Sequence, residues 1–350
     1  MKKFFSVVCV LVFCAFAVLS ISSCKKKQVY KDECECFLDF EDAKTFAKKA
    51  DQNILLLITS RGDDFISQQF IDDVLMSESF QDSIAIDYVV CHFDFSQYSY
   101  EKTVVPDDAT KEEKEHITHY AELMQQGYQK AVLLDCQYTP AIFLLTKEGY
   151  VISEVEYTDE ILTVEDFSNL LSEYDDVVEH YEQLVEATKK GSNIEKVHAI
   201  DTLNNETPEK YRSMLIELTK TIPDLDKKNE SGLCSKYIVD VAEAKAIEFY
   251  SKGDIAGAVQ SYISACDNKF IEPEEKQECY YMAAYLLASA GADDYQVILS
   301  YLNSALNACP DGDKVQYINS AIEYYKVQEE EKVKQAQAEQ SAQNDQPKSE

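Results

Sequence analysis

Glycine and proline are both scarce in this chain, with 9 and 7 residues among 350. A fold of many short strands needs many turns rich in these residues, so the composition favours a helix-rich architecture. Basic residues are also in deficit: 33 Lys and Arg stand against 64 Asp and Glu, which gives a formal net charge of −31. A nucleic-acid partner is therefore not expected, because phosphate binding requires a basic surface.

Motifs that carry metal or cofactor chemistry are missing as well. The sequence has no Gly-rich phosphate loop, and Cys34-Glu35-Cys36 is a C-x-C motif with no second pair nearby, unlike a zinc site. Acidic residues are so numerous that a pair of carboxylates identifies no catalytic site. We predict no catalytic residue, metal or cofactor. Apolar residues make up 45% of the chain, enough for two folded domains.

The N-terminus has the layout of a secretory signal peptide. Met1-Lys2-Lys3 is basic, the segment 4–19 is apolar, and two serines precede Cys24. This pattern resembles a bacterial lipoprotein signal, although the usual signal has Ala and Gly before the cysteine. The resemblance implies that residues 1–23 are removed and that Cys24 carries palmitate or a similar acyl chain.

Two alternatives remain open for this segment: an uncleaved membrane-spanning anchor and an ordinary cleaved signal peptide. All three interpretations predict a body outside the cytoplasm, on the periplasmic or surface side of the cell envelope. Residues 24–38 then form a linker, and Lys25-Lys26-Lys27 can lie against anionic lipid headgroups.

Residues 39–175 alternate between strand and helix patterns, which predicts an α/β domain with a central mixed sheet flanked by helices. Continuous apolar runs predict buried strands, and apolar residues at helical spacing predict helices. The expected strands are Ile54–Thr59, Tyr88–Phe95, Ala141–Thr146 and Tyr150–Tyr157, and the expected helices are 65–82, 111–127 and 163–174.

This order of elements is similar to the thioredoxin fold. Its most specific feature is Tyr138-Thr139-Pro140-Ala141 ahead of an apolar strand, because the family has a cis-proline there. The resemblance implies a cis Thr139–Pro140 bond facing the loop that holds the redox cysteines. Asp94 at the end of the second strand also matches the family.

The redox motif itself is missing. Alignment of the helix after the first strand gives Asp64-Phe65-Ile66-Ser67 where the family has Cys-x-x-Cys. Asp at a helix start is a good cap but cannot exchange disulfides. The alternative is a divergent thiol–disulfide oxidoreductase or isomerase using Cys34, Cys36 or Cys136. We expect Cys91 and Cys136 to be small buried hydrophobes instead.

Two shorter motifs are weak. Arg61-Gly62-Asp63 is an integrin-type tripeptide, but three residues recur by chance, so its role is left open. His116 and His119 share one helix with several acids, a pattern common on solvated surfaces and rarely a metal site.

Residues 176–330 show no further strand patterns, so the sequence predicts an all-α domain there. Small and aromatic residues recur after 38–40 positions and are similar to tetratricopeptide repeats; the set is Ala246, Phe249, Gly253, Ala258, Tyr262 and Ala265, then Ala284, Leu287, Gly291, Leu302, Ala305 and Pro310. A generic helical bundle is the alternative. The cysteines of this domain can form disulfides, but the sequence does not assign their pairing. Tyr280, Tyr281 and Tyr285 are compatible either with the lining of a binding groove or with the hydrophobic core. The composition of residues 331–350 predicts a disordered tail.

These features predict a non-catalytic lipoprotein of the cell envelope that acts as a protein-binding or scaffolding module. Helical repeats of this kind present grooves to a protein or peptide partner.

Overall fold

The computed structural model describes residues 29–344. Cys24 and the signal-peptide segment lie outside the described residues. The chain divides into two compact units: the first ends at Leu170, and the second begins at Leu171 and takes in the stretches 133–135 and 149–153. Among the described helices, none is long and apolar enough to cross a membrane.

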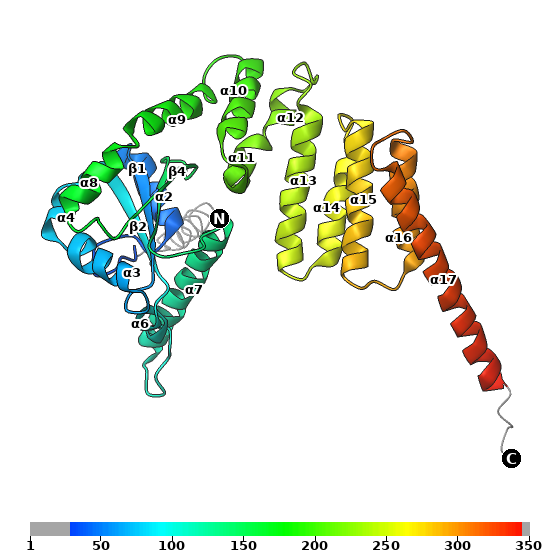
Figure 1. Ribbon diagram of the computed structural model, residues 1–350, viewed down its shortest axis with the longest axis horizontal. Helices are drawn as coiled ribbons and strands as arrows, with labels where there is room; N and C mark the ends of the chain where they lie inside the picture. The colour runs from blue at the N-terminus through cyan, green and yellow to red at the C-terminus, as the bar shows by residue number, and fades with distance from the viewer. Residues whose placement is uncertain (1–28, 345–350) are drawn as a thin grey trace, which may run out of the picture. The chain divides into compact units, whose positions relative to one another are not determined.

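The first unit combines a small sheet with helices (Figure 1). Its elements, in chain order, are α2 (Phe40–Ala50), β1 (Asn53–Thr59), α3 (Phe65–Gln69), the π-helical segment η1 (Phe70–Leu75), α4 (Glu78–Asp82), α5 (Ile84–Asp87), β2 (Tyr88–Asp94), α6 (Gln97–Glu101), α7 (Lys111–Leu133), β3 (Ala141–Leu145), β4 (Val151–Val155) and α8 (Val164–Ser172). The last residues of α8 already belong to the second unit.

The four strands form one mixed sheet in the order β2-β1-β3-β4. β1 pairs in parallel with β2, so that Thr59 lies opposite Asp94, and antiparallel with β3, so that Ile58 lies opposite Ala141. Every residue of β3 and six of the seven in β1 are buried, as the apolar runs predicted. This mixed α/β architecture is consistent with a thioredoxin-like domain.

A segment that we call the strap, Tyr30–Leu38, covers the free edge of β2. Phe37 N–H donates to the Val90 carbonyl, and His92 N–H donates to the Phe37 carbonyl, both at 2.9 Å. Asp32 closes the strap on itself by accepting from the backbone N–H groups of Cys34 and Cys36, each at 2.9 Å. The strap therefore supplies hydrogen bonds that an exposed strand edge would lack.

Helices pack in two pairs, with the sheet drawn between them in Figure 1. In one pair Lys130 of α7 lies 4.4 Å above the Phe40 ring of α2. In the other, Phe70 of η1 meets Phe167 of α8 edge-on, with ring centroids 5.3 Å apart. α7 approaches the sheet closely at Gly127, where a Cβ would lie 2.9 Å from the Phe93 ring.

The second unit is entirely helical in its long continuous part from Leu171. Its elements are α9 (Asp175–Ala187), α10 (Asn193–Glu206), the 3₁₀ helix η2 (Glu209–Leu215), α11 (Ile216–Thr219), α12 (Ile222–Leu225), α13 (Cys234–Ser251), α14 (Ile255–Cys266), α15 (Pro273–Ser289), α16 (Tyr295–Ala308) and α17 (Val315–Asn344).

Helices α13 to α16 make two hairpins with related turns. Gly253 and Gly291 both adopt left-handed backbone conformations, with φ of 75° and 73°. Asp254 and Asp294 cap the helices that follow by accepting a backbone N–H. The second turn has two more residues between its glycine and its aspartate, as the sequence spacing indicated. Ala258, Ala265 and Ala305 are buried where helices meet.

Several elements differ from their predicted form. The helix predicted over 65–82 is interrupted between η1 and α4. Within the predicted all-α domain, residues 209–225 form a 3₁₀ segment followed by two short α-helices. The repeat resemblance predicted that the Phe249 side chain packs in the space between two helices, but this side chain is 37% exposed. α17 continues to Asn344 through the predicted disordered tail, because its Ala, Gln, Glu and Lys residues are good helix formers.

Candidate functional site

The loop after β1 holds the positions at which the thioredoxin resemblance would put redox cysteines. Asp64 caps α3 by accepting from the N–H groups of Ile66 and Ser67, at 3.2 and 3.0 Å. Thr139 donates to the same carboxylate at 3.3 Å, and the Thr139–Pro140 bond is cis. The Asp64 cap and Thr139–Pro140 are therefore neighbours.

No thiol chemistry is available at those four positions. The Ser67 hydroxyl is buried and without a hydrogen-bond partner among the described residues. Burial opposes ionisation of Asp64, but hydrogen bonds from the backbone N–H groups of Ser67 and Ile66 and from the Thr139 hydroxyl outweigh it and lower its pKa. The side chain between them, Phe65, is 79% exposed. The loop thus presents an apolar surface beside an anionic cap.

Two of the three cysteines proposed as substitutes, Cys34 and Cys36, are poorly suited to be nucleophiles. Burial, reinforced by Asp32, raises the pKa of Cys34 to about 12 and also raises that of Cys36. Cys91 is fully buried, as expected, and burial raises its pKa too. Cys136 is half-buried rather than buried, because it lies in the turn after α7, with its N–H bonded to the Ala131 carbonyl.

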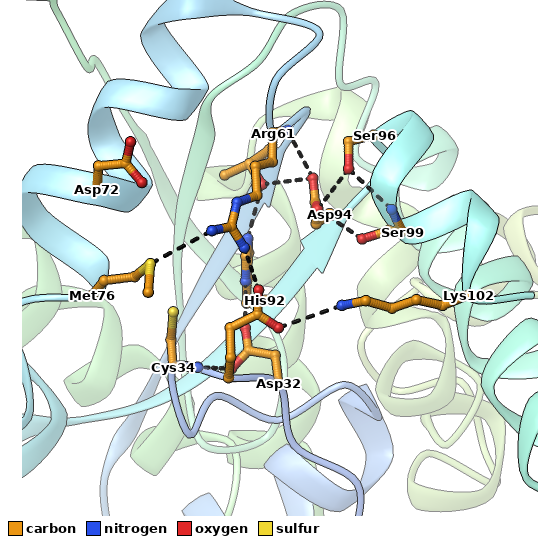
Figure 2. A network of polar contacts seen from close by, with 12 residues as sticks. Asp32, Cys34, Arg61, Asp72, Met76, His92, Asp94, Ser96, Ser99 and Lys102 are labelled. Carbon is orange, nitrogen blue, oxygen red and sulfur yellow. Dashed lines mark hydrogen bonds and ion pairs between the residues drawn. The ribbon is translucent and has the colours of Figure 1, made fainter.

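A polar network lies next to this loop, and Figure 2 shows its members. At its centre Asp94, at the end of β2, accepts four hydrogen bonds. Its Oδ1 accepts from Arg61 N–H at 2.9 Å and from the Thr59 hydroxyl at 3.3 Å. Its Oδ2 accepts from the Ser96 and Ser99 hydroxyls, each at 2.7 Å. Burial opposes ionisation, but these bonds outweigh it and lower the pKa of Asp94.

A second chain of contacts runs from the strap through the sheet. His92 Nδ1 lies 2.6 Å from Asp32 Oδ2, and His92 Nε2 lies 2.8 Å from Thr59 Oγ1. This order of carboxylate, imidazole and hydroxyl resembles a hydrolase triad in connectivity alone. Thr59 is fully buried and its hydroxyl points at Asp94, so it has no path to a substrate. These contacts hold the strap, through Asp32, against the ends of β1 and β2.

Charged side chains close the network on its outer side. Arg61 bonds to Glu33 of the strap, and its other terminal nitrogen lies 3.7 Å from Met76 Sδ. Lys102 also reaches Glu33, at 3.4 Å, and this carboxylate raises the pKa of Lys102 against the opposing effect of burial. Both cations lie over the Tyr98 ring, at 5.2 and 4.1 Å.

These groups surround a cavity of about 40 Å³ lined by Asp32, Cys34, Arg61, His92, Asp94, Ser99, Lys102 and Tyr120, among others. That is room for about one water molecule, against several hundred Å³ for a small-molecule substrate. This cavity is therefore too small for such a substrate, and its lining groups hold the strap and the loop in place. A recess of about 370 Å³ opens beside it and shares Asp32, Glu33, Lys102 and Tyr120 with it.

The integrin-type tripeptide is part of this network. Arg61 is engaged by Glu33 and Tyr98, and Asp63 accepts from Gln97 N–H at 2.7 Å. Neither charged side chain is presented freely to a receptor. His116 and His119 both pack on the ring of Tyr30, with centroids 5.5 and 4.5 Å from it.

A larger recess lies in the helical unit. It is a groove of about 400 Å³ between α13, α14 and the turn from α11 into α12; its lining is Lys220, Pro223, Tyr237, Ile238, Val241, Ala242, Lys245, Phe249, Gly257, Gln260, Ser261, Ser264, Ala265 and Asn268. Two lysines and no acidic residue line it, on a chain with a net charge of −31, and Lys220 is ion-paired with Glu217. Tyr280, Tyr281 and Tyr285 are not part of it.

Sequence reasoning missed the network and the groove lining. Asp32 and Glu33 lie far in the sequence from their partners His92 and Arg61 and carry no motif, and only the position of the strap brings them together. For the groove the available signal was Phe249 at a helical-repeat position. Its exposure depends on helix rotation, which spacing alone does not fix.

Comparisons with known proteins give limited matches. Residues 233–331 match the model of a family described as "Uncharacterised protein C-terminal domain". The chain is 26% identical over 128 residues to an uncharacterized protein of Treponema pallidum (strain Nichols), which is 37% of this chain and 42% of that relative. The match thus spans less than half of the relative's length. A solved structure, "DsbH Oxidoreductase", is 13% identical and covers 39% of this chain and 85% of its own, with a TM-score of 0.25, too low to carry an argument.

Proposed function

We propose that this protein is a non-catalytic lipoprotein of the cell envelope that binds a protein or peptide partner. Its first unit is a thioredoxin-like domain without redox activity, and its second is a tetratricopeptide-like domain that supplies the binding groove. The observation that carries the proposal is the partly apolar groove between α13 and α14, lined by the exposed Lys245 and by no acidic residue, on a strongly acidic chain.

The groove's chemistry favours an extended segment with apolar and acidic residues. Lys245 is exposed and makes no ion pair with any of the described residues, so its charge is available to a ligand. Phe249 and Val241 offer apolar contact, and Gln260, Ser261 and Asn268 offer hydrogen bonds.

Absence of catalysis is supported by the first unit. Asp64 and Ser67 occupy the degenerate redox-loop positions, and burial raises the pKa of Cys34 and Cys36. Thiol–disulfide oxidoreductase or isomerase activity through Cys34, Cys36 or Cys136 is the alternative. It requires that purified protein reduce insulin disulfides and that one Cys→Ser change abolish the rate.

A peptide-display experiment tests binding. Fluorescent ten-residue peptides in which apolar residues alternate with Glu are compared with a matched set containing Lys. We expect wild type to retain the Glu set, and Lys245→Glu or Phe249→Ala to lose it. Lys326→Glu, on an exposed position of α17, is the charge-matched control and keeps binding. Equal retention of both peptide sets, or no effect of Lys245→Glu, would reject the groove.

The envelope location follows from acylation of Cys24, which would anchor the chain through its lipid. Incorporation of labelled palmitate into wild type but not into Cys24→Ser would support it. Label that persists in the variant would contradict acylation at this residue.

A further inference from the structure

A recess of about 370 Å³ lies between the strap, the residue that follows α6 and one face of α7. Three segments that are distant in sequence line it: Tyr30, Lys31, Asp32, Glu33 and Leu38 from the strap, then Lys102, then His116 and Tyr120. It adjoins the cavity of about 40 Å³, since Lys102 and Tyr120 line both. Its volume is within the range of small-molecule sites.

The two carboxylates on its wall are already bonded on both oxygens. Asp32 accepts two backbone N–H groups of the strap on one oxygen, and its other oxygen lies 2.6 Å from His92 Nδ1. Glu33 binds Arg61 through one oxygen and Lys102 through the other. A cationic ligand would have to displace a contact that holds the strap, so the recess is poorly suited to cations.

The donors of the recess are held less firmly. Lys102 reaches Glu33 at 3.4 Å (Figure 2). Lys31 reaches Glu35 at 3.6 Å, and the Glu35 side chain is 72% exposed. Long, exposed ion pairs contribute little, so a ligand can replace them at small cost. His116 has no hydrogen bond or ion pair with any residue that the structure describes, so three donors remain for an acceptor from outside the protein.

One wall of the recess is flat and aromatic. The Tyr30 ring stacks on the His116 imidazole, with centroids 5.5 Å apart and planes at 25°. Tyr120 lies one turn further along the same face of α7, and Leu38 adds an apolar side chain from the strap. Such a wall favours a ligand with a planar, apolar body.

We propose that this recess binds a small organic carboxylate with a planar body. The carboxylate of the ligand accepts hydrogen bonds from Lys31, Lys102 and His116, and its body lies against Tyr30 and Leu38. Because the strap supplies most of the lining, the bound ligand joins the strap to α7 and keeps it closed over the edge of β2.

Three probes of one shape and different charge test the proposal: benzoate, benzamide and benzamidine. Their binding to the full chain is measured by saturation-transfer NMR over a range of probe concentrations. We expect saturable binding of benzoate with a Kd on the order of 1 mM, as suits so small a ligand, with weaker binding of benzamide and none of benzamidine. Equal binding of the three probes, or no binding of benzoate, would overturn the proposal.

Variants locate the bound carboxylate. Lys102→Gln and His116→Gln should each weaken benzoate binding roughly threefold or more. Lys111→Gln, also on α7 but ion-paired with Glu115, is the charge-matched control and keeps it. Lys245→Glu, in the groove of the helical unit, should keep it as well. Loss of binding in Lys245→Glu but not in Lys102→Gln would place benzoate in that groove and contradict the proposal.

Cys34 reports on the strap in the wild-type protein, without any variant. It is buried and lines the small cavity behind the strap, so a maleimide reaches it only when the strap opens. At a benzoate concentration of about twice the Kd, alkylation of Cys34, followed by peptide mapping, should slow about threefold, because only the unliganded fraction opens. An unchanged rate would show that the ligand does not close the strap, against the proposal.

Discussion

Asp94→Asn tests whether the polar network holds the first unit together. The carboxylate accepts two hydrogen bonds on each oxygen, all from groups inside the unit. An Asn side chain keeps one accepting oxygen and turns an NH₂ group toward the other two donors. The backbone N–H of Arg61 cannot reverse its role, so the amide oxygen must face it.

The magnitude follows from the bonds that are lost. The NH₂ group would face the Ser96 and Ser99 hydroxyls, which must rotate to accept. Each hydrogen bond to a charged group contributes about 1.5–3 kcal/mol, and part is recovered by rotation. We expect a loss of about 2–4 kcal/mol and a fall of roughly 5–15 °C in the Tm of this unit.

The pH dependence has a definite sign. The pKa of Asp94 is lowered from 3.8 in the folded state, so its stabilising effect is fully present only well above the ordinary pKa, at about pH 5 and higher, and is lost as the pH falls through the folded pKa. The Tm difference between wild type and Asp94→Asn should be constant from pH 7 to about 5 and shrink toward pH 3.

Thermal unfolding followed by circular dichroism measures this difference. Asp108→Asn, on an exposed loop, is the control and should match wild type at each pH. An Asp94→Asn protein as stable as wild type at pH 7, or a difference that persists unchanged at pH 3, would refute the role assigned to the carboxylate.

Two further substitutions test packing and the strap. Gly127→Ala places a methyl group 2.9 Å from the Phe93 ring, so urea unfolding should show a loss of about 1–3 kcal/mol, whereas Gln126→Ala on the exposed face of α7 stays near wild type. Asp32→Ala removes the partner of the imidazole and the acceptor that closes the strap, so alkylation of Cys34 by a small maleimide should accelerate roughly tenfold or more. An unchanged rate would mean that other contacts hold the strap closed.

The sheet could be predicted from the sequence because its strands are buried on both faces. Continuous apolar runs such as Ile54–Thr59 have no competing interpretation as an amphipathic surface helix. The helix predicted over 65–82 was harder, since its apolar spacing continues across the interruption after η1. α2 has no counterpart in the prediction, although Asp39 caps it and Ala43 and Ala47 form its buried face.

The candidate site was predictable only where residues are adjacent in sequence. Asp64, Ser67 and Pro140 could be placed by resemblance, and the first two explain why the loop lacks thiol chemistry. The strap could not be predicted, because hydrogen bonds between Phe37 and β2 depend on long-range pairing.

A charge-reversal titration tests peptide binding by the groove most directly. Fluorescence anisotropy is measured for one retained Glu-containing peptide and its Lys analogue, against wild type and Lys245→Glu. The account predicts that the variant binds the Glu peptide about tenfold more weakly than wild type does and binds the Lys analogue more tightly than wild type does, because the charge of one ion pair across the groove is reversed. Equal affinity of both proteins for the Glu peptide would contradict it.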